Sequence, residues 1–136
     1  MGADSAATNT LRAALNQSQV IDLTTTGRTS GQPRRIEIFL HHDDGLLFIS
    51  GMPRADRPRD WISNIRADAR VVVHLKQSVH ADVPATARVV DDPDERRPLI
   101  EGAARRWRRT DIEDMMLHSP LIVLTVDDSA GAPEDA

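Results

Sequence analysis

The chain has 136 residues and a formal net charge of −4 at pH 7, a length typical of one domain with its own hydrophobic core. It contains neither cysteine nor tyrosine, which excludes disulfides, thiolate metal sites, cysteine nucleophiles and any mechanism that requires a phenol. No run approaches 18 consecutive apolar residues and none of signal-peptide length lies near the start, so we expect a soluble, cytoplasmic protein.

The hydrophobic pattern predicts an alternation of short helices and strands. In chain order we expect a helix at residues 8–16, strands at 20–26, 34–41 and 46–50, a helix at 60–67, strands at 70–76 and 83–90, helices at 91–107 and 111–117, and a last strand at 120–126. The second strand alternates clearly, because Ile36, Ile38 and Leu40 share one face. Asp60 is expected to cap the helix that follows it, since aspartate is favoured at that position.

The order of these elements indicates the fold class. Several strands follow one another directly, which favours an α+β protein with an antiparallel barrel or sheet of about six strands and peripheral helices over a doubly wound parallel sheet. We expect residues 1–19 to form an N-terminal extension with a short helix, residues 20–126 to form the ligand-binding domain, and residues 127–136 to form a disordered acidic tail.

The turn after the first strand is the first candidate site. The segment Leu23–Arg35 reads LTTTGRTSGQPRR. Its two glycines and one proline predict a hairpin-like turn that carries three arginines and two hydroxyl side chains. Bare backbone, hydroxyls and guanidinium groups suit a multiply charged anion such as a phosphate. The same composition is also typical of a solvated surface turn, which remains the structural alternative.

A second arginine-rich loop follows the third strand. It spans residues 51–60 and contains Arg54, Arg57 and Arg59. Six of the 17 basic residues therefore lie in two turns of an acidic chain. Local positive potential in such a chain indicates a specific anionic ligand rather than nucleic acid.

The remaining motifs favour structural roles. Neighbouring residues of a strand point to opposite faces, so we do not expect His41 and His42 to share a metal ion. We expect His74 at the surface near a strand end. The run Arg105–Arg109 is compatible with an anion or membrane site, but cations at a helix C-terminus are favoured by the helix dipole alone. His118 precedes the last strand and is a candidate catalytic group at the border of a pocket.

Together these segments resemble the deazaflavin-dependent nitroreductase family. The resemblance is carried by the Thr–Gly–Arg–x–Ser–Gly–x–Pro–Arg turn, Ser50-Gly51, the Trp61–x–x–Asn64 helix and the valine strand after it, over about residues 20–126. It implies the split β-barrel fold shared with flavin-binding pyridoxamine-phosphate oxidases. It also implies that the two loops bind the phosphate and polyglutamate tail of the deazaflavin coenzyme F-420. By match, the coenzyme-binding residues would be Arg28, Thr29, Ser30, Gly31, Arg34, Arg35, Ser50, Gly51, Arg54, Arg57, Arg59, Trp61 and Asn64.

The resemblance further implies hydride transfer from the reduced coenzyme to a small electrophilic acceptor such as a quinone, an enone or a nitro compound. Nitroreductase members have tyrosines before the last strand, and the equivalent stretch here has none. The resemblance therefore supports the family's cofactor for this chain more strongly than the family's substrate. FMN is the alternative cofactor, and a non-catalytic binder of flavin, haem or fatty acid is the alternative function. We expect a monomer or homodimer with the site inside one chain, walled by Met115–Leu117, and neither nucleic-acid binding nor stable membrane insertion.

Overall fold

The structure, a computed structural model, describes residues 11–43, 45–53 and 59–126. Residues 11–15 are helical. The elements that follow are β1 (Gln19–Thr26), β2 (Pro33–Asp43), β3 (Leu46–Ser50), α2 (Asp60–Ala67), β4 (Arg70–Lys76), β5 (His80–Val89), α3 (Pro93–Trp107), α4 (Ile112–His118) and β6 (Leu121–Val126). Each predicted element is present within a few residues of its expected bounds. The start of the first helix and the predicted tail at 127–136 lie outside the described residues.

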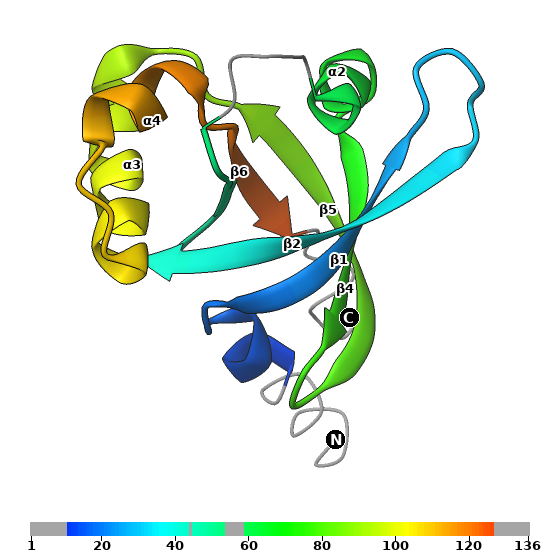
Figure 1. Cartoon of the computed structure of the whole chain (residues 1–136). Helices are drawn as coiled ribbons and strands as arrows, with labels where there is room; N and C mark the ends of the chain where they lie inside the picture. The colour runs from blue at the N-terminus through cyan, green and yellow to red at the C-terminus, as the bar shows by residue number, and fades with distance from the viewer. Residues whose placement is uncertain (1–10, 44, 54–58, 127–136) are drawn as a thin grey trace.

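The six strands form a closed barrel in the order β1-β2-β3-β6-β5-β4, and every neighbouring pair is antiparallel (Figure 1). β1 closes the barrel because it pairs on both sides: Leu23 lies opposite Ile36 of β2 and opposite Val73 of β4. Closure satisfies the backbone of a sheet that would otherwise present two free edges. The expected α+β barrel of antiparallel strands is therefore confirmed.

Alternate residues of each strand fill the barrel. The innermost include Ile21, Leu23, Leu40, Ile49, Val73, Val83 and Ile122, all essentially inaccessible to solvent. The inward face predicted for the second strand is confirmed, because Leu40 is buried and Ile36 and Ile38 pack against the same core. Burying one such side chain stabilises the fold by about 1.5–3 kcal/mol, so this interior fixes the register of the strands.

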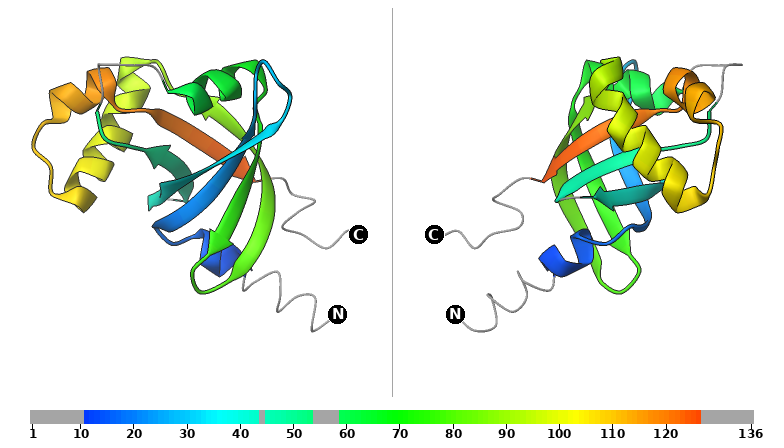
Figure 2. Two further views of the ribbon diagram at one scale, coloured as in Figure 1. Left: turned by 45° about the vertical axis from the view of Figure 1, so that its right-hand side comes forward. Right: turned by 90° about the vertical axis from the view of Figure 1, so that its left-hand side faces the viewer.

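A second core lies outside the barrel, under two helices. α3 lies across β3 and β6, and α4 packs beside it (Figure 2). The outward-facing Phe48 and Leu121 of those strands meet Ile100 and Ala103 of α3 and Met115 of α4. Met115 is fully buried here, so it does not wall a pocket as expected from the sequence. Two arginines at and after the end of α3 are also engaged, since Arg106 pairs with Asp43 and Arg109, beyond the helix, pairs with Asp111.

α2 lies at the end of the barrel where the β1–β2 turn is found, between that turn and the helices α3 and α4 (Figure 1). Its buried residues are Asn64 and Ile65, and Trp61 and Ile62 pack against the barrel core. The expectation that Asp60 caps the helix is wrong. The cap position is Arg59, which makes no side-chain capping hydrogen bond, and Asp60 is the first helical residue. At this position the helix dipole stabilises its negative charge. Because the carboxylate makes no capping bond, it can face a neighbouring segment.

No helix among the described elements covers the outer face of β1, β4 and β5 (Figure 2), and that face carries the polar side chains of Asp22, Lys76 and Asp82. His74 is buried in the middle of β4, so its expected surface position is wrong. Its ring bonds Thr24 of β1 through Nε2 and Asp82 of β5 through Nδ1, both at 2.7 Å. The described residues contain no cluster of three or more His, Asp or Glu side chains suited to a metal ion. Nor does any described helix have the length and apolar character needed to cross a membrane.

Candidate functional site

The β1–β2 turn is built by its own backbone. Gly31 donates from its N–H to Gly27 O, and Gly27 donates to Gln32 O, both at 2.8 Å. Gly31 has a φ of 71°, a left-handed conformation that glycine adopts without strain. The Ser30 hydroxyl accepts from Gln32 N at 3.1 Å. Several turn amides are thus used within the turn, so an anion here would be met mainly by side chains rather than by bare backbone.

Asn64 of α2 joins this turn to the helix. Its Oδ1 accepts from the Arg28 backbone N–H at 3.1 Å and from Arg28 Nη1 at 3.2 Å. Its Nδ2 donates to Thr25 Oγ1 at 3.2 Å, and the side chain is 4% exposed. Asn64 therefore holds the turn from α2 and acts mainly through Arg28.

We expect Asn64→Ala to lower the free energy of unfolding by about 2 kcal/mol, because a buried donor and acceptor lose their partner at once. Asn64→Asp is the matched control, since it keeps the oxygen that accepts from Arg28 and should cost less. Urea denaturation of the two variants checks this. Equal midpoints for Asn64→Ala and the unaltered protein would show that the turn holds itself in place.

A hollow of about 780 Å³, called here the turn hollow, lies between the turn and α2. It is lined by Gly27, Arg28, Thr29, Ser30, Pro33, Arg34, Arg35, Ile36, Asp60, Trp61 and Asn64. Gly27 lies where these side chains converge: a Cβ there would lie 2.7 Å from Ser30 Oγ and 3.6 Å from Arg34 Nε. Seven of the predicted coenzyme-binding residues come together here, namely Arg28, Thr29, Ser30, Arg34, Arg35, Trp61 and Asn64.

The three arginines of the turn are not equivalent. Arg28 is directed toward α2, with its Nη1 also 3.4 Å from Asp60 O. Arg35 donates from Nε to Asp22 at 3.0 Å. Hydrogen bonds from Lys76, the larger cause, and from Arg35 hold the pKa of Asp22 below its ordinary value. Arg34 is exposed and makes no hydrogen bond or ion pair with the other described side chains. Arg34 is therefore the cation most available to a ligand in the turn hollow.

The predicted residues of the second loop lie elsewhere. Ser50 is buried at the end of β3, and its hydroxyl has no hydrogen-bond partner among the residues that the structure describes. A Cβ on Gly51 would lie 3.1 Å from Pro120 Cγ. Arg59 donates to His118 O at 3.1 Å and also to Met52 O. It thus ties the loop and α2 to the end of α4. Arg54 and Arg57 lie outside the described residues.

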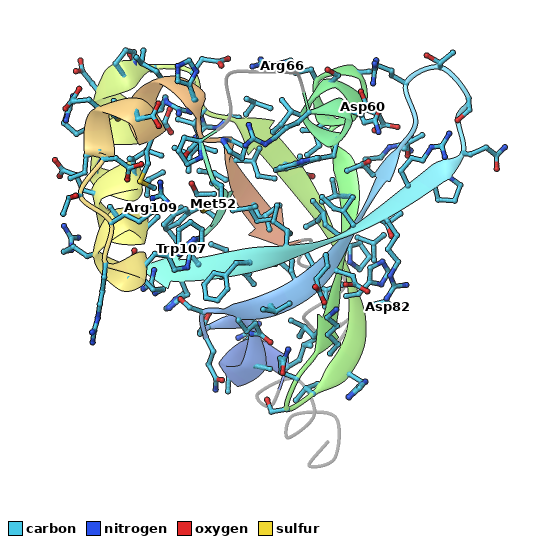
Figure 3. The ribbon with its side chains drawn as sticks, in the orientation of Figure 1. Met52, Asp60, Arg66, Asp82, Trp107 and Arg109 are labelled. Atoms are coloured by element: carbon cyan, nitrogen blue, oxygen red, sulfur yellow. The ribbon has the colours of Figure 1, made fainter. Side chains whose placement is uncertain are left out.

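A second cavity of about 660 Å³, the helix cavity, lies between α2, α3 and α4 on the other side of α2. Its apolar wall includes Ile62, Met116 and Leu117, and His118 and Arg59 also line it. The expected wall at residues 115–117 is thus formed by Met116 and Leu117. Figure 3 shows the two sides of α2, with Asp60 toward the β1–β2 turn and Arg66 toward α3 and α4.

No pattern in the sequence predicts the ion pairs at this cavity. Arg66 makes a two-pronged pair with Asp91, at 2.9 and 3.0 Å, and Arg97 pairs with Glu113 at 3.1 Å. Each pair joins two elements whose approach depends on the tertiary fold. Asp60 likewise lines the turn hollow, although its place at the start of a helix predicts only a capping role.

Comparison with known families gives one match over most of the chain. A family model described as F-420H(2)-dependent quinone reductase matches residues 4–127. The match spans the turn, α2, both cavities and all six strands of the barrel.

Several solved structures share the fold. A conserved hypothetical protein from Mycobacterium tuberculosis superposes with a TM-score of 0.65 at 18% identity, over 94% of this chain and 89% of that one. An F-420-H(2) dependent reductase gives 0.59 at 20% identity, over 78% and 93%. A putative pyridoxamine 5'-phosphate oxidase from Listeria innocua gives 0.63 at 15% identity, over 89% and 94%. At these identities the likeness establishes the barrel fold.

Proposed function

Because this chain belongs to the F-420H(2)-dependent quinone reductase family, we propose that its turn hollow binds the acidic tail of the reduced coenzyme and that a small quinone or enone accepts the hydride. The chain is a deazaflavin-dependent oxidoreductase whose coenzyme is F-420, as the sequence resemblance implied.

The observation that supports the coenzyme site is the donor set of the turn hollow. The guanidinium groups of Arg28 and Arg34 and the hydroxyls of Thr29 and Ser30 line one hollow in a chain of net charge −4. Charge-assisted hydrogen bonds from such groups suit phosphate and carboxylate oxygens. Gly27 leaves room for Ser30 and Arg34 to converge, since a Cβ would fill the space between them. These residues fit the phosphate and polyglutamate tail of the coenzyme.

The helix cavity is the proposed place for the coenzyme ring and the acceptor. When bound, the reduced deazaflavin supplies the hydride. The chain's own contribution is positional: Ile62, Met116 and Leu117 offer an apolar wall that would shield the reacting groups from water. A proton must also reach the reduced acceptor, and it would come from solvent or from His118, which lines the same cavity.

We expect Arg34→Ala to weaken coenzyme binding by about 1–3 kcal/mol, because it removes a charge-assisted contact. Its stability should change little, since an exposed arginine contributes weakly to folding. Arg88→Ala is the matched control: Arg88 is also exposed, pairs with Glu95 and lies outside both cavities. Arg28→Ala is a less clean variant because Asn64 also depends on Arg28.

The test is a titration of the purified protein with F-420, followed by turnover of the reduced coenzyme with a panel of quinones and enones. Tight binding that Arg34→Ala weakens and Arg88→Ala leaves alone supports the proposed site. Equal affinity of the two variants for F-420 would show that the coenzyme tail does not bind in the turn hollow. Binding without turnover on the whole panel would reject the proposed acceptor class, and native mass spectrometry would then reveal a copurified flavin, haem or lipid.

A further inference from the structure

The turn hollow contains a negative charge of its own. Among its described lining residues Asp60 is the one acid, in a site otherwise supplied with arginines and hydroxyls. Its Oδ1 lies 3.6 Å from Arg28 Nη2. An anionic ligand that enters this hollow must therefore meet a carboxylate that already faces one of its cations.

The guanidinium of Arg28 has two distinct sides. Its Nη1 is directed into α2, where Asn64 Oδ1 and Asp60 O accept from it at 3.2 and 3.4 Å. Its Nη2 faces the Asp60 carboxylate. The helix thus occupies Nη1, and of the two terminal nitrogens Nη2 is the one that a ligand can approach. A ligand oxygen that approaches Nη2 competes directly with Asp60.

Asp60 is held weakly enough to be displaced. Its side chain is 84% exposed, against 44% for Arg28, and the separation of 3.6 Å is longer than a hydrogen bond. Exposed ion pairs of this kind contribute little to stability. The backbone of Asp60 is fixed as the first residue of α2, but the side chain can rotate into water.

The charge has a physical role when no ligand is bound. Arg28 and Arg34 line the same hollow, and like charges brought together repel one another. A carboxylate at the first turn of a helix is also favoured by the helix dipole. The Asp60 carboxylate offsets the repulsion between the two arginines and interacts favourably with the helix dipole. It lies where the anion of a ligand would also offset that repulsion.

We propose that the Asp60 carboxylate is an internal competitor for the anion of the coenzyme, displaced from Arg28 on binding, and that it thereby sets coenzyme affinity. The inference rests on the proposed function, in which the coenzyme tail occupies the turn hollow. Asp60 therefore lowers the affinity for any anion that must displace it from Arg28. Its removal should strengthen binding, the opposite of what is expected for a residue that contacts ligand favourably.

The test compares Asp60→Asn with the unaltered protein by titration with F-420 at low and high salt. We expect Asp60→Asn to bind about threefold to tenfold more tightly at low salt, with the gain shrinking at high salt as the charge is screened. Asp94→Asn is the matched control, since Asp94 is an exposed acid in the first turn of α3, outside both cavities. It should leave the affinity unchanged.

Unchanged or weaker binding by Asp60→Asn would overturn the inference, as would an equal gain in Asp94→Asn. A parallel titration with inorganic pyrophosphate measures the same ratio of affinities for a simple anion. If the unaltered protein binds pyrophosphate but not F-420, the proposed function fails while the pyrophosphate ratio still decides the role of Asp60. Melting temperatures of both variants show whether a change in affinity follows from a change in folding.

Discussion

Replacing Arg96 with methionine will lower the free energy of unfolding by about 3–5 kcal/mol, because the change strips several buried carbonyl groups of their donor. Arg96 lies on α3 and is almost fully buried. Its guanidinium donates to four backbone oxygens, those of Val90, Met115, Met116 and Ser119, at 2.9 to 3.2 Å.

These oxygens belong to three segments that also meet in the second core, where Ile100, Met115 and Leu121 pack together. Met115 and Met116 lie in α4, where Met115 O also accepts from Ser119 N at 3.0 Å, and Ser119 begins the connection to β6. Burial lowers the pKa of Arg96 below its usual value, but arginine remains charged at neutral pH. The single cation therefore links the end of α4 and the connection to β6 with Val90, the residue after β5, beside the helix cavity.

Urea denaturation with two comparison variants measures this effect. Arg96→Lys keeps the charge but not the planar set of five donors, so it should lose about half as much stability. Arg97→Ala changes the next residue, which is 45% exposed in its pair with Glu113, and should lie within about 1 kcal/mol of the unaltered protein. Similar midpoints for Arg96→Met and Arg97→Ala would show that the four carbonyls find other partners.

Acidification from pH 7 to pH 4 will remove about 3 kcal/mol of stability that depends on one histidine, His41. His41 is fully buried on β2, where its ring stacks on Phe48 at 4.8 Å and 9° and contacts Phe39 and Trp107. Burial, followed by the charge of Arg106, lowers the pKa of His41 from 6.5 to about 4.

Arg106 also determines the tautomer. Its Nη1 donates to His41 Nδ1 at 2.9 Å while its Nη2 pairs with Asp43 at 2.7 Å. The neutral ring therefore carries its proton on Nε2, a buried atom that has no hydrogen-bond partner among the described residues. A second proton on Nδ1 would face the guanidinium, so protonation is resisted by both desolvation and repulsion.

The sign of the pH dependence follows from these states. The unfolded chain takes up the proton near pH 6.5, and the native state does so only near pH 4. Between these values the unfolded state binds more protons. The contribution of His41 to the free energy of unfolding is therefore fully present above about pH 6.5 and is lost as the pH falls toward 4. Removing the ring removes this titration whatever its effect on packing.

The measurement is the urea midpoint at several pH values from 4 to 7. His41→Asn keeps an acceptor for Arg106 and should flatten the slope in this window, although it loses the stack on Phe48. His42→Asn, at the neighbouring residue outside the ring cluster, should keep the slope of the unaltered protein. A slope that persists in His41→Asn would assign the pH dependence to other groups.

The local patterns of the sequence were sufficient for the elements and the faces they bury. Alternation along β2 and helical spacing in α2 and α3 depend on neighbours two to four residues apart, and burial follows from them directly. The turn at residues 27–35 is similar, because its glycines, proline and arginines act within one short segment. The family resemblance added the closed barrel and the coenzyme, since those segments occur together in this order.

The tertiary structure decided the partners of each polar group. Arg28 meets Asn64 across 36 residues, Arg96 meets Ser119 across 23, and Arg106 meets His41 across 65. No periodicity in the sequence predicts contacts at such separations. The sequence also does not distinguish a charged side chain that is solvated from one that is paired with another charge or surrounded by carbonyl groups. Thus Asp60, interpreted as a cap, faces an arginine of the turn hollow, and His74, expected at the surface, is buried between two strands. Barrel closure and the packing of α2 and α3 bring these groups within reach, because only the folded chain fixes distances between remote segments.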